Sequence, residues 1–314
     1  MRLSFPTLGQ VDTNATADAL ALHQMRLHDK KVTAVIEISE QAERRILIVY
    51  AHGTQVGAYR IEGDSCQPLN ADELSAIWSG DPRPVRVIPL PDMTGRLAYL
   101  ACESSKRTSA RGTNQNAWDQ QLRTWKQEAA TGLVEIASSE AHGFIQLSGG
   151  EPLENESLVI SRAERLSPGF EPEKPETAWE AQLLDIDPAS MSGQCLTLRR
   201  AAHHWSRAVF ESYQNIAGEK FLLVMLHELQ AQVRPWKWNI HVEQKGVRDE
   251  HFFPGADSTA HAYRAILMGM GAQMSFAIGG YLAQRILSEM FAELTLDERA
   301  RLEAHRLIPA AFSE

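Results

Sequence analysis

The stretch TAVIEI at residues 33–38 is rich in β-branched side chains and predicts a β-strand. Residues 45–50, RILIVY, predict a second strand, which closes on a turn at Gly53. The same pattern returns in residues 131–136, TGLVEI, and in residues 143–150, GFIQLSGG. The sequence therefore contains a pattern of two strands that occurs twice, and this repeat decides the predicted fold.

The spacing within the two copies is nearly the same. Thr33 lies 20 residues before Gly53 (53 − 33), and Thr131 lies 19 residues before Gly150 (150 − 131). A glycine at such a turn adopts positive φ without a Cβ clash, and a helix is predicted before each copy. Two copies can pair because one small sheet cannot bury its apolar face alone. We predict a β-hairpin unit used twice; chance likeness between short aliphatic strands is the alternative.

The rest of the first half supplies a helix and further strands. Residues 71–78 predict a short helix, and residues 85–90 and 96–101 predict two strands. Residues 103–116, ESSKRTSARGTNQN, are small and polar, which is typical of a linker or mobile loop.

The last third is predicted to be helical. Trp205, Val209 and Tyr213 fall on one face of a helix, and Phe221 and Met225 begin a second apolar stripe. The sequence therefore predicts an α+β protein with two related β-rich units and flanking helices, followed by a mainly helical C-terminal domain. The expected domains are residues 1–102, a linker or mobile loop at 103–116, a second β-rich unit at 117–192, and a helical domain at 193–314.

Charge and cysteine content argue against several classes of function. The formal net charge is −9, which disfavours binding to nucleic acid. Lys106, Arg107 and Arg111 are the only local basic group, and we interpret them as part of a solvated linker. The three cysteines lack the spacing of a zinc site or a secreted disulfide framework, so we expect free thiols. No signal-peptide pattern or membrane-spanning run is present, which favours a cytoplasmic location.

The histidines give the strongest hint of chemistry, because seven of eleven fall between residues 203 and 305. His203 and His204 are adjacent and would point about 100° apart on a helix, so they do not suit one ion. His227-Glu228 resembles the start of HExxH, but the second histidine is missing. We predict no catalytic residues, no metal and no cofactor.

Two sets of residues are candidates for binding. Trp236 and Trp238 are two apart in a predicted strand and would share one face, which suits an interaction surface; covering the helical core is the alternative. A ligand, if one binds in the helical domain, would be lined by these residues: Trp205, Phe221, Met225, His227 and Met274.

The repeated pattern resembles the PATAN-type domains of bacterial signalling proteins, in which a G-x-I/L-x-F/L-x-x-G strand follows a strand of small residues. Residues 143–150 carry this motif, and residues 45–53 carry it more loosely. The first copy lacks the opening glycine, and Gly150 is followed by Glu151-Pro152 rather than a small apolar pair. The resemblance implies a non-catalytic protein-interaction module of bacterial motility or two-component systems.

Three functions are weighed. The first is a non-catalytic interaction or regulatory scaffold in a bacterial-type signalling or assembly system, with a protein partner and with self-association left open. The second is an enzyme of an unfamiliar family, with His204, Glu211, His227 and His241 lining a pocket. The third is a small-molecule sensor with an apolar ligand in the helical domain.

Overall fold

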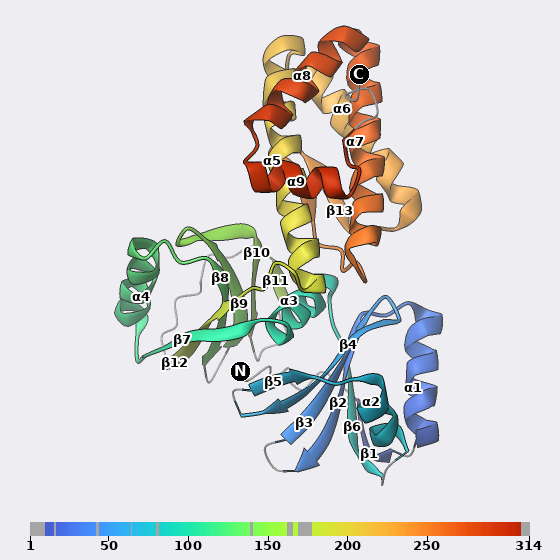
Figure 1. Cartoon of the computed structure of the whole chain (residues 1–314), viewed down its shortest axis with the longest axis vertical. Helices are drawn as coiled ribbons and strands as arrows, with labels where there is room; N and C mark the ends of the chain where they lie inside the picture. The colour runs from blue at the N-terminus through green and yellow to red at the C-terminus, as the bar shows by residue number, and fades with distance from the viewer. Residues whose placement is uncertain are drawn as a thin grey trace. The chain divides into compact units, whose positions relative to one another are not determined.

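The computed structural model describes residues 10–15, 17–41, 44–63, 65–79, 82–138, 141–161, 166–168 and 178–308. The chain divides into two compact units, residues 1–187 and 188–314. Antiparallel sheets make up the first unit and helices dominate the second, so the predicted α+β class is confirmed (Figure 1). Among the described residues, no helix combines the length and the apolar character that crossing a bilayer demands.

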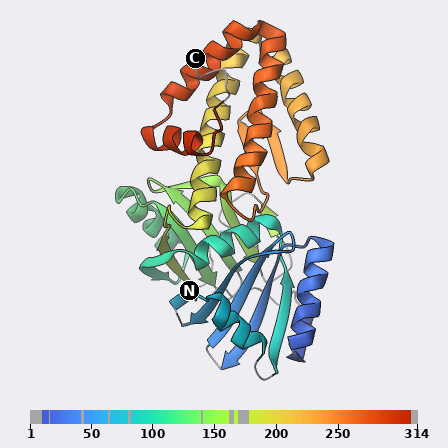
Figure 2. The same cartoon turned by 45° about the vertical axis from the view of Figure 1, so that its right-hand side comes forward.

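The first sheet has six strands in the order β1-β6-β2-β3-β4-β5. Its strands are β1 (Gln10–Ala15), β2 (Ala34–Gln41), β3 (Arg44–Ala51), β4 (Thr54–Glu62), β5 (Ser65–Pro68) and β6 (Arg83–Pro89). Helices α1 (Ala17–Lys30) and α2 (Ala71–Trp78) cover one face (Figure 2), where Leu20, Leu74 and Ile77 pack on alternate strand residues such as Ile36 and Ile48. The helix α3 (Asp92–Cys102) packs against β3 and β5.

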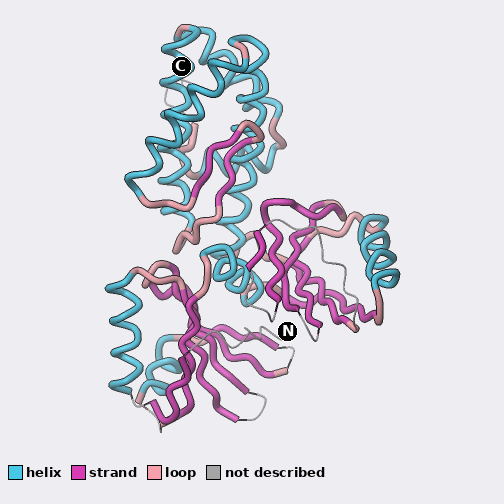
Figure 3. Tube along the Cα trace, turned by 180° about the vertical axis from the view of Figure 1, so that it is seen from behind, coloured by secondary structure: helices cyan, strands magenta, loops and turns pink. Residues whose placement is uncertain are grey.

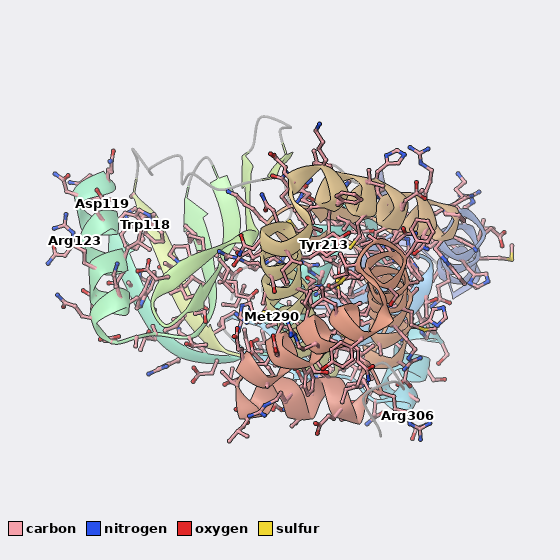
Figure 4. All side chains as sticks on the ribbon, turned by 90° about the horizontal axis from the view of Figure 1, so that it is seen from above. Trp118, Asp119, Arg123, Tyr213, Met290 and Arg306 are labelled. Atoms are coloured by element: carbon pink, nitrogen blue, oxygen red, sulfur yellow. The ribbon has the colours of Figure 1, made fainter. Side chains whose placement is uncertain are left out.

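The second sheet has the order β11-β10-β9-β8-β12-β7. Its strands are β7 (Ser105–Gly112), β8 (Gly132–Ser138), β9 (Ala141–Ser148), β10 (Glu151–Ser161), β11 (Leu166–Pro168) and β12 (Trp179–Asp185). One face is covered by α4 (Gln115–Gln127), whose Trp118 (labelled in Figure 4) and Trp125 are buried against Trp179 of β12. The Trp118 ring meets the Trp125 and Trp179 rings edge-on, at centroid distances of 5.9 and 5.0 Å.

The two sheets share one strand order. In each, the first strand pairs with the sixth, the sixth with the second, and the remaining strands follow in sequence to the edge. In each, a helix joins the first strand to the second: α1 in one sheet and α4 in the other. Figure 3 shows the two groups of strands as separate sheets.

The likeness extends to one turn. In the first sheet, the N–H of Gly53 donates to the carbonyl of Val32 at 2.9 Å, and the N–H of Val32 donates to Leu27 at 3.1 Å. Gly53 adopts φ +79°, and a Cβ there would lie 2.5 Å from the carbonyl oxygen of Leu27. The turn between β3 and β4 is thus seated on the end of α1, at a position that only glycine fits.

The second sheet repeats these contacts in the turn between β9 and β10. The N–H of Gly150 donates to the carbonyl of Ala130 at 2.7 Å, and the N–H of Ala130 donates to Trp125 at 2.8 Å. Gly150 adopts φ +83°, and a Cβ there would lie 2.3 Å from the Cα of Lys126. The N–H of Gly149 completes the turn by donating to Thr131 Oγ1 at 2.9 Å.

Two expectations for the first unit are corrected. Residues 96–101 were expected to form a strand, but they lie in α3. Every residue from Met93 to Cys102 is buried, so this helix has no solvent-exposed polar face. Its sequence therefore lacks the alternation of apolar and polar residues by which an amphipathic helix is recognised. Residues 103–116 were expected to be a linker or mobile loop, but they contain β7, which pairs with β12 and is the edge strand of its sheet as far as the structure describes it. Its side chains are mostly exposed, which accounts for the loop-like composition.

The second unit is a helical bundle with one small hairpin, and its first helix begins at Met191. Its elements are α5 (Met191–Ala217), α6 (Glu219–Val233), the 3₁₀ turn η1 (Arg234–Trp236), β13 (Ile240–Glu243), β14 (Gly246–Asp249), α7 (Ala256–Ile278), α8 (Gly280–Glu293) and α9 (Leu296–Ala304). The long helix α5 contacts α6, α7, α8 and α9 and so runs through the bundle. Tyr213 of α5 is buried in its core, and Met290 of α8 packs against that core (Figure 4).

Candidate functional site

The described part of the second unit presents an aromatic surface at the end of α6. Trp236 and Trp238, called the tryptophan pair below, stack with ring centroids 5.0 Å apart and planes 9° from parallel. His261 of α7 meets both rings edge-on, with centroids 5.3 and 5.9 Å away. Trp236 is 54% exposed, whereas Trp238 is partly buried and packs against the core. A large aromatic face is therefore packed in place at the surface.

The local sequence explains the stack. Pro235 cannot extend α6, so the chain leaves the helix through the 3₁₀ turn η1. Lys237 then adopts the left-handed conformation, φ 57°, and its N–H donates to the Arg234 carbonyl at 3.1 Å. This reversal brings the rings on either side of Lys237 face to face. The tryptophans were expected in a strand, but β13 begins at Ile240, and the left-handed residue gives them a common face instead.

Aromatic contacts continue from the tryptophan pair toward the interior. The Trp238 and Phe253 ring centroids are 6.1 Å apart, and Phe253 meets the His251 ring at 4.5 Å. Phe253 and His251 are both buried. The exposed pair is thus the outer end of a continuous aromatic column.

The column ends beside a buried ion pair. Arg199 Nε of α5 donates to Asp249 Oδ2 of β14 at 2.7 Å, and both side chains are almost fully buried. Asp249 also accepts from the Tyr263 hydroxyl at 3.0 Å and from the His251 N–H at 2.9 Å. Such a pair is held in place by its hydrogen bonds, and losing one partner would leave a buried charge. The network fixes α5, α7 and the hairpin behind the aromatic surface.

Of the residues predicted to line a ligand pocket, some are buried in the helical core and others are exposed at the surface. Trp205, Met225 and Met274 are buried in the helical core, where they pack among other apolar side chains. Phe221 is 54% exposed and His227 is also exposed, so neither joins that buried group. The five residues are not brought together around one space.

The residues considered as an enzyme site are also separated. His204 is bound to Glu298 of α9, Glu211 pairs with Arg207 on its own helix, and His241 contacts Asn239. Across the ranges that the structure describes, His204, Glu211, His227 and His241 form no shared set of metal ligands. His203, next to His204, instead contacts the carbonyl of Val247 at 3.1 Å.

The basic group at residues 106–111 lies on β7 and faces acidic partners. Arg107 lies 3.6 Å from Asp185, and Arg111 forms an ion pair with Glu180, both on the neighbouring strand β12. The arginines therefore contribute to cross-strand pairing.

Sequence reasoning named the two tryptophans but missed what surrounds them. His261, Phe253 and His251 come from other elements, and their approach depends on tertiary packing. The one local sequence signal for this surface was the spacing of Trp236 and Trp238 directly after Pro235. Compared with known proteins, this chain matches no protein-family description, no curated protein and no solved structure.

Proposed function

We propose that this protein is a non-catalytic interaction or regulatory scaffold that binds a protein partner through the tryptophan pair. The observation that carries the proposal is the stacked, half-exposed Trp236. Tryptophan is enriched where binding energy concentrates, because it buries a large area at low entropic cost. Here the cost is lower still, since the ring is already fixed by Trp238 and His261.

The first unit supports a scaffold in a second way. We propose that its two sheets are copies of one unit, on the basis of the shared strand order and the matching turns at Gly53 and Gly150. A duplicated sheet multiplies surface without adding a reactive group. We also propose the cytoplasm as its location and a bacterial-type signalling or assembly system as its setting; the PATAN-type resemblance supports the signalling role.

The experiment compares Trp236→Ala with a matched control. Phe276→Ala is the control, because Phe276 is 92% exposed on the same unit and lies about 22 Å along α7 from His261 at 1.5 Å per residue. Proteins recovered with the full chain from its own cell extract are quantified for the natural chain and both variants. A partner found this way is then purified, and its Kd is measured directly.

A hot-spot tryptophan contributes about 2 kcal/mol or more, so Trp236→Ala should weaken Kd about 30-fold, while Phe276→Ala leaves it unchanged. Circular dichroism should be the same for all three proteins, because the removed side chain is half exposed. The proposal fails if no recovered protein depends on Trp236, or if the purified partner binds the Trp236→Ala variant with the same Kd.

A further inference from the structure

Two cysteines from distant parts of the first unit meet at the edge of its first sheet. Cys66 lies on β5, the edge strand, and Cys102 is the last residue of α3. Both are free thiols, with Cys66 partly exposed and Cys102 buried. The third cysteine, Cys195, is buried on α5 of the other unit.

The sheet register directs Cys66 toward α3. Cys66 is directly opposite Ile61 on β4, and opposed residues of antiparallel strands project from the same face. Tyr59 lies two residues before Ile61, so it projects from that face too. Tyr59 and Cys66 therefore stand on one side of the sheet.

The end of α3 lies against this side. Tyr99 and Cys102 are three residues apart and so share a helix face. The Tyr59 and Tyr99 ring centroids are 6.2 Å apart, and the Tyr59 hydroxyl donates to Glu103 Oε1 at 3.3 Å. These contacts hold the last turn of α3 over the edge of the sheet at β5, where the Cys102 thiol lies next to the Cys66 thiol.

The surroundings give the two thiols different roles. Burial raises the pKa of the Cys102 thiol, and its contact with Cys66 and the nearby charges of Glu135 and Glu103 raise it further. A protonated, buried thiol reacts slowly with small oxidants, because the thiolate is the nucleophile. Cys66 is the more accessible sulfur and is the one an oxidant reaches first.

We propose that Cys66 and Cys102 form a reversible disulfide when the protein meets a peroxide. The Cys66 thiolate attacks one peroxide oxygen, so that an S–O bond forms, the O–O bond breaks and hydroxide leaves. Cys102 sulfur then attacks Cys66 sulfur, so that the S–S bond forms, the S–O bond breaks and the hydroxyl leaves as water with the Cys102 proton. Two thiols are oxidised by two electrons, and hydrogen peroxide is reduced to two waters.

The test treats the full-length protein with hydrogen peroxide, removes the oxidant, and alkylates the remaining thiols with N-ethylmaleimide under denaturing conditions. Mass spectrometry of the digest should show a peptide linking Cys66 to Cys102, with only Cys195 alkylated. If the oxidised protein is reduced with dithiothreitol before alkylation, all three cysteines should again be alkylated. Cys195→Ser is the matched control and should form the link as the natural chain does.

Cys66→Ser should abolish the link and leave Cys102 alkylated, and Cys66→Ala should give the same result if the serine variant is poorly folded. The proposal is overturned if all three thiols remain alkylated after peroxide treatment. It is equally overturned if Cys66 proceeds to sulfinic acid without a link, or if non-reducing gels show only a bond between two chains.

Discussion

The glycine turn of the second sheet allows a sharp test of how this fold is specified. Gly149 and Gly150 are adjacent and both adopt positive φ, +59° and +83°. A Cβ at Gly149 would meet open space, whereas one at Gly150 would lie 2.3 Å from Lys126 Cα and 2.6 Å from the Trp125 carbonyl oxygen. Alanine at either position therefore has the conformational cost of positive φ. Only alanine at Gly150 also has the cost of a steric clash with α4.

The magnitudes follow from these contacts. An alanine forced into the left-handed region costs about 1–2 kcal/mol, which is the whole expected effect of Gly149→Ala. At Gly150 the obstructing atoms belong to the backbone of α4, so they cannot rotate away. Moving the helix end weakens two hydrogen bonds of about 1 kcal/mol each, from Gly150 to Ala130 and from Ala130 to Trp125. Gly150→Ala should lose about 3–4 kcal/mol in all.

Hydrogen exchange measured by mass spectrometry suits this test, because it reports on peptides of the second sheet separately from the helical unit. The free energy of opening for β8 and β9 should fall at least about 2 kcal/mol further in Gly150→Ala than in Gly149→Ala. Gly53→Ala should have an effect of the same size on β2 and β3, since its Cβ would lie 2.5 Å from the Leu27 carbonyl oxygen. Equal losses in the two adjacent variants would refute the steric reasoning.

Two further predictions concern the helical unit. Asp249→Asn should lower the free energy of unfolding of residues 188–314 by about 3–5 kcal/mol, because Arg199 would keep a buried charge without its partner. Replacing both residues by leucine removes that charge but also removes the acceptor of the Tyr263 hydroxyl and the His251 N–H, so it should recover only part of the loss. Hydrogen exchange measures both changes. Burial acts to raise the pKa of Glu298, but hydrogen bonds from Thr295 and His204 outweigh it and hold that pKa below its ordinary value. Ionised Glu298 therefore stabilises α9 above the pKa of an unfolded glutamate, and this contribution is lost as the pH falls through the lower folded pKa. Urea titrations at several pH values should show a steeper acid loss for the natural chain than for Glu298→Gln, and parallel curves would contradict the assignment.

Local patterns in the sequence predicted much of this fold. The strands at residues 33–38 and 131–136 could be recognised because their β-branched residues reflect local preference. The helix at residues 71–78 was predicted with its observed limits. Each of these features is decided by residues close together in the chain.

The features that were missed depend on distant contacts. α3 is buried on every side, so it carries no polar period that would mark a helix. β7 is an exposed edge strand whose polar residues resemble a loop until β12 pairs with it. The approach of Cys66 to Cys102 requires both the sheet register and the docking of α3, and neither can be inferred from cysteine spacing.

The strand order has a consequence for how the chain is made. In each sheet the sixth strand is inserted between the first and the second, so β6 separates β1 from β2 and β12 separates β7 from β8. During synthesis, the growing chain must keep that gap open until Pro89 or Asp185 has left the ribosome. Pairing over such sequence separations is slow, and unpaired strand edges invite aggregation in the meantime. Nascent chains stalled before Pro89 or Asp185 has emerged from the ribosome should therefore need chaperone protection. Chains stalled after that residue has emerged should no longer need it.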